Sequence, residues 1–194
     1  RPMKVPESGT EVYNSIATTG DSGSAREISG VGFSGDLVFS KHRDGGNGWP
    51  VADRLRGLGS STSKLRFSTA AEQSGTTDHI NFTMDGFTVG TSGEVNYSGY
   101  TYIHNVLKRA PSFMDVVCYS GNGTAGRGVA HGLKVVPEMM LVKTRNQTNG
   151  WGVYHKDMTT ASYFMRLNTT EAQASDNGFW NGTAPNASTF IVGD

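Results

Sequence analysis

A glycine-rich segment is the first place where the sequence could hold a ligand. Residues 121–126 are Gly-Asn-Gly-Thr-Ala-Gly and follow an apolar run. They fit the pattern G-x-G-x-x-G of dinucleotide-binding folds. That chemistry requires a helix directly after the glycines, because the helix N-terminus holds the pyrophosphate. The next residues, 127–132, include Gly128 and Gly132 and cannot form a stable helix. The sequence therefore predicts a turn here and no cofactor.

Side chains that bind metal ions are present but scattered. The histidines are His42, His79, His104, His131 and His155. None of them forms an H-x-H or H-x-x-x-H pair, the spacing that brings two imidazoles to one ion. Asp21, Asp36 and Asp44 lie in or near predicted loops, but their spacing matches no EF-hand or similar calcium motif. We predict no metal site.

The segment Gly20-Asp21-Ser22-Gly23 is similar to the nucleophile segment of chymotrypsin-like serine proteases. In that family the catalytic His and Asp precede the serine, whereas no histidine lies upstream of Ser22 in this chain. No pair of carboxylates stands out for glycoside hydrolysis either. The sequence assigns no catalytic residue, so an enzyme is the least favoured class of function.

Three tryptophans are candidates for contact with sugars. Trp49, Trp151 and Trp180 lie beside loops rich in Asn and Asp. Lectin-like sandwiches hold sugars by stacking aromatic rings on pyranose faces while amides bind the hydroxyl groups. The competing interpretation is that each ring packs at the rim of the fold, and we favour it for all three.

The composition argues against several classes of partner. The chain has 194 residues, in which 17 Lys and Arg balance 17 Asp and Glu. No overall charge therefore draws it to nucleic acid or to an anionic membrane. No apolar run approaches the roughly 20 residues of a membrane span, so no membrane insertion is predicted. Cys118 is the single cysteine, and its place in Val116-Val117-Cys118-Tyr119 predicts a small buried strand residue.

The elements that must position these residues recur along the chain. Lys41-x-Arg43 followed by Asn47-Gly48-Trp49 recurs 102 residues later as Lys143-x-Arg145 followed by Asn149-Gly150-Trp151. Two more blocks recur at offsets of 100 and 103, Leu65–Thr69 as Met165–Thr169 and Phe87–Gly90 as Phe190–Gly193. Small changes of offset are typical of loop insertions and deletions between two copies of a duplicated domain.

Each copy predicts a β-hairpin. Side chains alternate from Leu37 to Arg43, residues 44–48 form a Gly- and Asn-rich turn, and alternation resumes at Trp49. The same pattern spans residues 139–155. A loop of about five residues would place Arg43 opposite Trp49 and, in the second copy, Arg145 opposite Trp151. We predict a cation–π contact in each pair, worth about 0.5–1 kcal/mol at an exposed site.

Together the patterns predict an all-β fold of two tandem antiparallel β-sandwich modules, jelly-roll or lectin-like, related by an internal repeat. Residues 1–11 form an N-terminal extension, 12–109 the first module and 113–194 the second. Further strands are expected at 64–69, 80–84, 87–90 and 100–107, and at most a turn or two of helix at 51–58 and 157–164. Residues 100–107 are apolar on both faces and are expected at the centre of a sheet.

The second copy is shorter than the first. It has no counterpart to residues 92–108, which include the predicted central strand. We expect the missing strand to come from chain beyond Asp194, or from another segment or subunit.

Several segments resemble a known family. They are Phe33–Arg43, with the order Phe-x-x-Asp-Leu-Val near its start, Tyr119–Thr124, His131–Leu133, Pro137–Lys143, Asp85–Gly90 and Val95–Tyr102. In this order they resemble a repeated domain of tail-fibre-like structural proteins of bacteriophages, especially marine ones. The chain departs at Gly35, where the pattern has proline, and in the missing strand. The resemblance carries no catalytic residue across.

The resemblance implies a virion structural protein, a tail-fibre or appendage segment that acts as a spacer or faces the host receptor. Its partners would be itself, as a homotrimer, other virion proteins and a host surface glycan. The alternative is a secreted carbohydrate-binding, lectin-like module.

Overall fold

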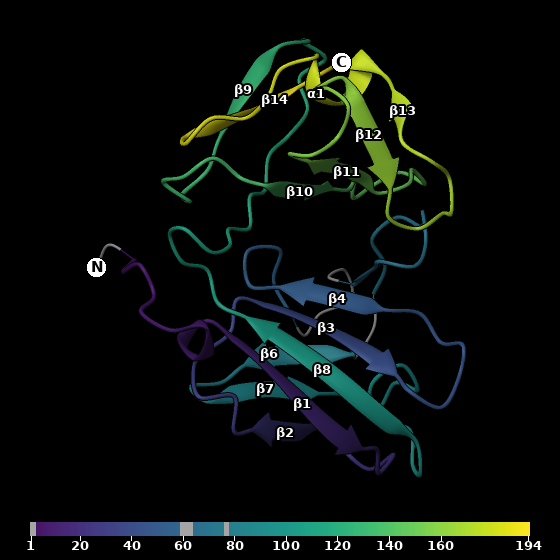
Figure 1. Cartoon of the computed structure of the whole chain (residues 1–194). Helices are drawn as coiled ribbons and strands as arrows, with labels where there is room; N and C mark the ends of the chain where they lie inside the picture. Colours follow the sequence, from purple (N-terminus) through teal and green to yellow (C-terminus); the bar gives the residue numbers. More distant parts are fainter. Residues whose placement is uncertain (1–2, 59–63, 76–77) are drawn as a thin grey trace.

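This computed structural model describes residues 3–58, 64–75 and 78–194. The described chain is nearly all β (Figure 1). Its helical elements are a 3-10 turn, η1 (Gly9–Glu11), and one turn of α-helix, α1 (Asn177–Trp180). No described helix is long and apolar enough to cross a membrane. The all-β prediction is confirmed, whereas residues 51–58 and 157–164 hold turns instead of helix.

Residues 12–109, the first half, form two facing antiparallel sheets. The larger has the order β1 (Tyr13–Thr19), β8 (Thr101–Leu107), β3 (Leu37–His42), β4 (Pro50–Asp53), β5 (Leu65–Arg66). The smaller has the order β2 (Arg26–Ser29), β7 (Gly86–Val89), β6 (His79–Phe82). Val38, Phe87 and Val106 are fully buried in the core between them.

Strand β8 is an interior strand of the larger sheet, second from its edge, and is flanked on both sides as its sequence predicts. It pairs with β1 along one edge and with β3 along the other. Tyr102, His104 and Val106 all point inward and have no exposed surface. The alternation of β3 is also confirmed, because Val38, Ser40 and His42 are buried on the same inner face.

Residues 113–194, the second half, contain two smaller sheets. One has the order β10 (Met139–Val142), β11 (Gly152–His155), β12 (Tyr163–Arg166), β13 (Ala174–Ser175). The other pairs β14 (Thr189–Val192) with β9 (Arg127–Ala130). Tyr154, Phe164 and Trp180 form the core of this half.

Several hydrogen bonds occur at matching positions of the two halves. Arg54 N donates to Asp36 O, and 102 residues later Lys156 N donates to Glu138 O, both at 2.8 Å. The Arg26 guanidinium donates to Thr19 O, and the Arg127 guanidinium donates to Ser120 O. Gly90 N donates to Asp78 O, and Gly193 N donates to Phe179 O. The residues that make these bonds are separated by 101 to 103 positions between the two halves.

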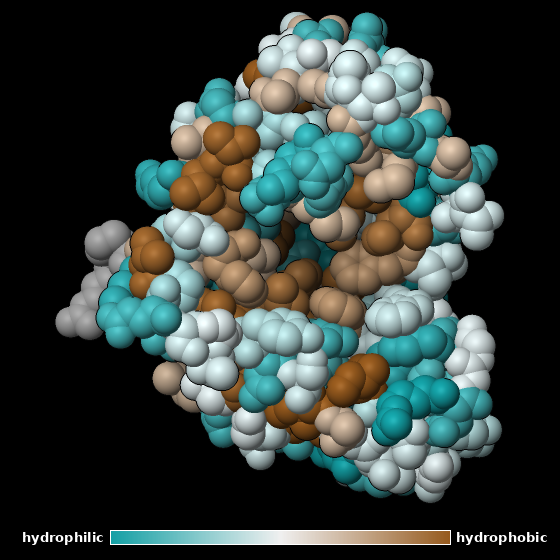
Figure 2. All heavy atoms as spheres, viewed as in Figure 1, coloured by the Kyte–Doolittle hydropathy of each residue, from teal (hydrophilic) through white to brown (hydrophobic). Residues whose placement is uncertain are grey.

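The two halves meet through an apolar contact. Trp151, from the second half, packs with Val51 and Leu65 of the first. Its ring centroid lies 5.0 Å from that of Phe67, and its Nε1 donates to Arg66 O at 2.8 Å. Hydrophobic residues gather at mid-height, around the hollow where the halves come together (Figure 2).

The hairpin register differs from the prediction by two residues. Phe39 pairs with Val51 and Leu141 with Val153, so Arg43 and Arg145 do not lie opposite Trp49 and Trp151. The first loop is longer than expected, because Arg43 N donates to Thr101 O and so extends the pairing of β3 with β8.

The predicted cation–π pairs are therefore wrong. Among the described residues, the cations that lie over aromatic rings are Arg54, Arg127 and Arg166, and none lies over a tryptophan. The recurring lysine has a different role. Lys41 Nζ donates to the carbonyls of Gly45 and Asn47, and thus closes the loop on itself.

The prediction for Cys118 is also wrong. This residue is exposed and lies in no strand. Residues 115–120 pair with no strand in the described part of the chain, so no neighbouring strand covers Cys118.

Candidate functional site

The three candidate tryptophans do not form one surface. Trp180 is 1% exposed in the core of the second half, and Trp151 is 6% exposed at the junction. Trp49 alone remains half-exposed, with its ring centroid 6.3 Å from that of Phe39. Trp151 and Trp180 both pack against aromatic rings, so of the three candidates only Trp49 presents its ring to solvent.

Polar side chains in the core of the first half form a hydrogen-bonded chain. Ser40 Oγ lies 2.8 Å from His79 Nε2 and 2.7 Å from His104 Nδ1. The other nitrogen of His104, Nε2, lies 2.9 Å from Thr18 Oγ1. The chain thus joins strands of both sheets across the core. The sequence predicts that Val38, Ser40 and His42 share a face, but not that this face is the inner one or that His79 meets Ser40 there.

Burial keeps both histidines of this chain neutral. Loss of hydration lowers the pKa of His79 from 6.5 to about 4, although the nearby Asp78 carboxylate opposes the shift. Burial likewise lowers the pKa of His104 to about 3, with a further contribution from His79. Ser40 and His104 have no exposed surface. A substrate could not reach this serine. The hydrogen-bonded side chains therefore hold the two sheets together in the core.

A buried ionic cluster lies beside these histidines. Lys64 Nζ contacts Asp78 Oδ2 at 2.6 Å and Glu94 Oε2 at 3.2 Å. Arg66 also pairs with Glu94, at 2.5 Å from Nη2 to Oε1. Each charge has an opposite partner, which is what burial of charges requires. The cluster fixes β5 and the loop before β8.

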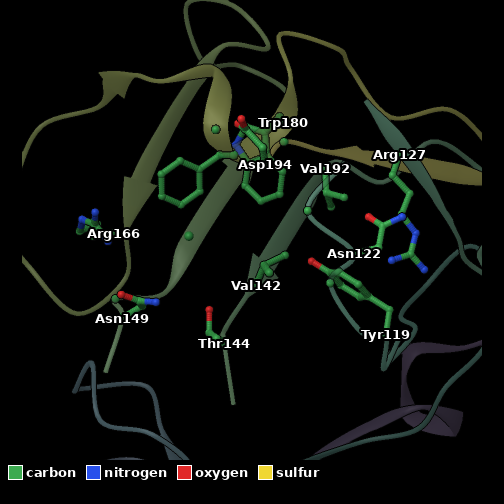
Figure 3. A pocket seen from close by; sticks show the side chains of 17 residues that line it. Tyr119, Asn122, Arg127, Val142, Thr144, Asn149, Arg166, Trp180, Val192 and Asp194 are labelled. Carbon is green, nitrogen blue, oxygen red and sulfur yellow. The ribbon is translucent and has the colours of Figure 1, made fainter. Parts of the chain in front are cut away.

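The second half contains an open cavity of about 390 Å³ (Figure 3). It lies between the loop after Cys118, the ends of β10, β11 and β12, helix α1 and strand β14. The side chains labelled in Figure 3 are those of Tyr119, Asn122, Arg127, Val142, Thr144, Asn149, Arg166, Trp180, Val192 and Asp194. The cavity opens to solvent.

Neither a metal site nor a nucleotide site is found among the described residues. No group of three or more His, Cys, Asp or Glu side chains converges in the ranges 3–58, 64–75 and 78–194. The glycine-rich segment is a turn, as predicted, with positive φ at Gly123 and Gly126. Strand β9 follows it in place of a helix.

The comparisons with known proteins identify a family. A family model described as a domain of unknown function (DUF7483) matches residues 8–194. The chain belongs to this family. The match spans both halves, so the DUF7483 domain comprises the junction and the cavity together. No curated protein and no solved structure matches the chain.

The cavity of the DUF7483 domain is lined by several side chains that can donate hydrogen bonds. Arg166 lies over the rings of Phe164 and Phe179, and its Nε is 3.8 Å from Glu171 Oε2. Trp180 lines the cavity, and its buried Nε1 has no hydrogen-bond partner among the described residues. Burial raises the pKa of Tyr119, so this phenol is protonated at neutral pH. The site therefore offers N–H and O–H donors and no nucleophile.

Proposed function

We propose that the chain is a non-enzymatic structural protein of a bacteriophage particle, a segment of a tail fibre or appendage. It consists of two tandem β-sandwich modules, residues 12–109 and 113–194, related by an internal repeat. The hydrogen bonds that recur between the halves at offsets of 101 to 103 support this arrangement. Several segments of the sequence resemble phage fibre domains. This resemblance supports a place in the phage particle.

The junction at Trp151 is the observation that carries this proposal. A buried tryptophan from one module packs on the sheet of the other and donates to its backbone, at Arg66 O. Such a contact restrains rotation between modules, which suits a stiff spacer. The side chains that could catalyse a reaction, Ser40, His79 and His104, are enclosed in the core of the first module.

Oligomeric state tests this function. Phage fibres of the resembled kind are homotrimers, so we expect light scattering to give three times the 20.7 kDa chain mass. Mass spectrometry of purified particles should detect the chain as a virion component. A monomer at micromolar concentration that is absent from particles would contradict the proposal.

One observation favours the alternative, a secreted carbohydrate-binding module. The ring of Trp49 is 37% exposed beside the polar loop that holds Asn47. If this ring stacks on a sugar, a glycan array should show binding that the variant Trp49→Ala loses. Glycan binding by a particle-free monomer would favour this alternative over the structural role.

A further inference from the structure

The second half has both neighbours of a strand but not the strand. In the first half β8 lies between β1 and β3. The segment 114–120 corresponds to β1, because Arg127 bonds Ser120 O as Arg26 bonds Thr19 O. Strand β10 corresponds to β3 through the matched bonds at Glu138 and Asp36. In the described structure no strand pairs with the free edge of β10, and residues 115–120 pair with none.

The cavity occupies the place that β8 fills in the first half. There, His104 of β8 forms hydrogen bonds with Thr18 and Ser40, and Ser40 forms another with His79. The corresponding residues of the second half are Tyr119, Val142 and Trp180. All three line the cavity. Figure 3 shows Tyr119 and Trp180 on different sides of the hollow, with Val142 below.

A positive charge lies at the place where the first half pairs an arginine with a carboxylate. Arg66 pairs with Glu94, which lies just before β8 in the chain. Its counterpart, Arg166, lines the cavity and has only the 3.8 Å contact with Glu171 as an ion pair among the described residues. Both arginines pack against the glycine before the tryptophan, Gly48 or Gly150, which shows that they occupy equivalent positions.

We propose that this cavity and the free edge of β10 form an acceptor site for an extended peptide strand of β8-like chemistry. The strand pairs with β10 and carries an acidic residue about ten positions before its buried centre, where it meets Arg166. An acceptor atom on it satisfies the Nε1 of Trp180, which is buried without a partner among the described residues. The inference rests on the two-module arrangement proposed above, but not on a location in a phage particle.

The backbone of β10 is arranged for such pairing. Lys156 N donates to Glu138 O, so the backbone of Glu138 faces β11. In an antiparallel pair every second residue of a strand bonds to the same neighbouring strand, and the residues between them face the opposite edge. Met140 and Val142 therefore bond to β11, and the N–H and C=O groups of Met139 and Leu141 face the free edge. Addition of a peptide strand to an exposed edge is an established mode of recognition. Proteins usually cover such edges because uncovered ones aggregate.

The chain itself supplies the probe. A synthetic peptide with the sequence of residues 92–108 carries β8 and Glu94. We expect a fluorescently labelled form to bind the full chain, as measured by anisotropy, while a scrambled peptide does not. Replacing Glu94→Lys in the peptide should weaken binding about tenfold or more, because a charge-assisted hydrogen bond is lost and repulsion replaces it. The protein variant Arg166→Glu should restore binding of that Glu94→Lys peptide.

The control is Lys134→Glu, the same change of charge at an exposed residue that does not line the cavity. It should leave the affinities of both peptides unchanged. Leu141→Pro removes an N–H of the free edge and should abolish binding.

Absence of binding by the 92–108 peptide would overturn the proposal, as would equal binding of the native peptide and its Glu94→Lys variant. Amide protection at Met139 and Leu141 without peptide would also overturn it, because the edge would already be paired, for example with a second copy. None of these outcomes depends on trimerisation or on presence in a particle, so they are distinguishable from failure of the proposed function.

Discussion

Acidification should unfold the first half through its buried histidines. The folded state lowers the pKa of His79 from 6.5 to about 4 and that of His104 to about 3. Between pH 6.5 and about 4 the unfolded chain therefore binds more protons than the folded one. Above pH 6.5 these histidines do not reduce the free energy of unfolding. As pH falls from 6.5 toward 4, their protonation in the unfolded chain lowers it steadily.

The size of the effect follows from the two shifts. Each histidine costs about 1.4 kcal/mol per pH unit below 6.5, so the pair costs about 4 kcal/mol at pH 5. The charges around His79 are those of Asp78, Lys64 and Glu94, and the charge near His104 is that of Arg26. Asp21 and Asp44 have pKa values below 3.8 because of hydrogen bonds to their carboxylates, so they act only at lower pH.

Urea unfolding followed by circular dichroism at pH 7.5, 6 and 5 measures this loss. The variant His104→Gln removes one titrating group, so we expect it to halve the slope of unfolding free energy against pH. Equal stability at pH 7.5 and pH 5, or an unchanged slope in His104→Gln, would refute the reasoning.

Two further predictions concern the junction and the ionic cluster. Trp151→Ala should cost about 3–5 kcal/mol and separate the calorimetric transitions of the two halves, because a buried ring is lost. The control Trp49→Ala, at the corresponding exposed ring, should cost about 1 kcal/mol or less. A single calorimetric transition in Trp151→Ala would contradict the role of the junction. Lys64→Met should cost about 3–5 kcal/mol in urea unfolding, because two carboxylates lose their buried cation. Lys156→Met breaks only an exposed pair and should cost far less than Lys64→Met. Equal losses in the two variants would argue against the buried cluster.

Much of the strand structure could be predicted from alternation. Strands β3 and β8 are predicted at nearly their observed bounds, because side chains alternate between two faces along β3 and both faces of β8 carry mainly apolar or aromatic residues. Register was not predictable in the same way. It depends on where the loop ends, and the bond from Arg43 N to Thr101 O that sets this joins residues far apart in the sequence.

The site residues were harder to foresee than the strands. Ser40 lies 39 residues from His79 and 64 from His104, so no local spacing relates them. Whether Trp49 or Trp151 is buried depends on which sheet the ring meets, and both residues follow the same Asn-Gly pair in the sequence. The sequence predicts that the second copy lacks a counterpart of residues 92–108, whereas the cavity lined by Tyr119, Val142 and Trp180 could be found only in the structure.

The pairing of β1 with β8 determines how the first half responds to tension. Tyr13, where β1 begins, lies beside Leu107, where β8 ends. A pull applied through the two ends of this half therefore separates the strands from one end, and loads their hydrogen bonds one after another. Strands loaded in this unzipping geometry open at lower force than strands sheared past each other. The first half is thus mechanically weak under tension along the chain, even though its core is tightly packed.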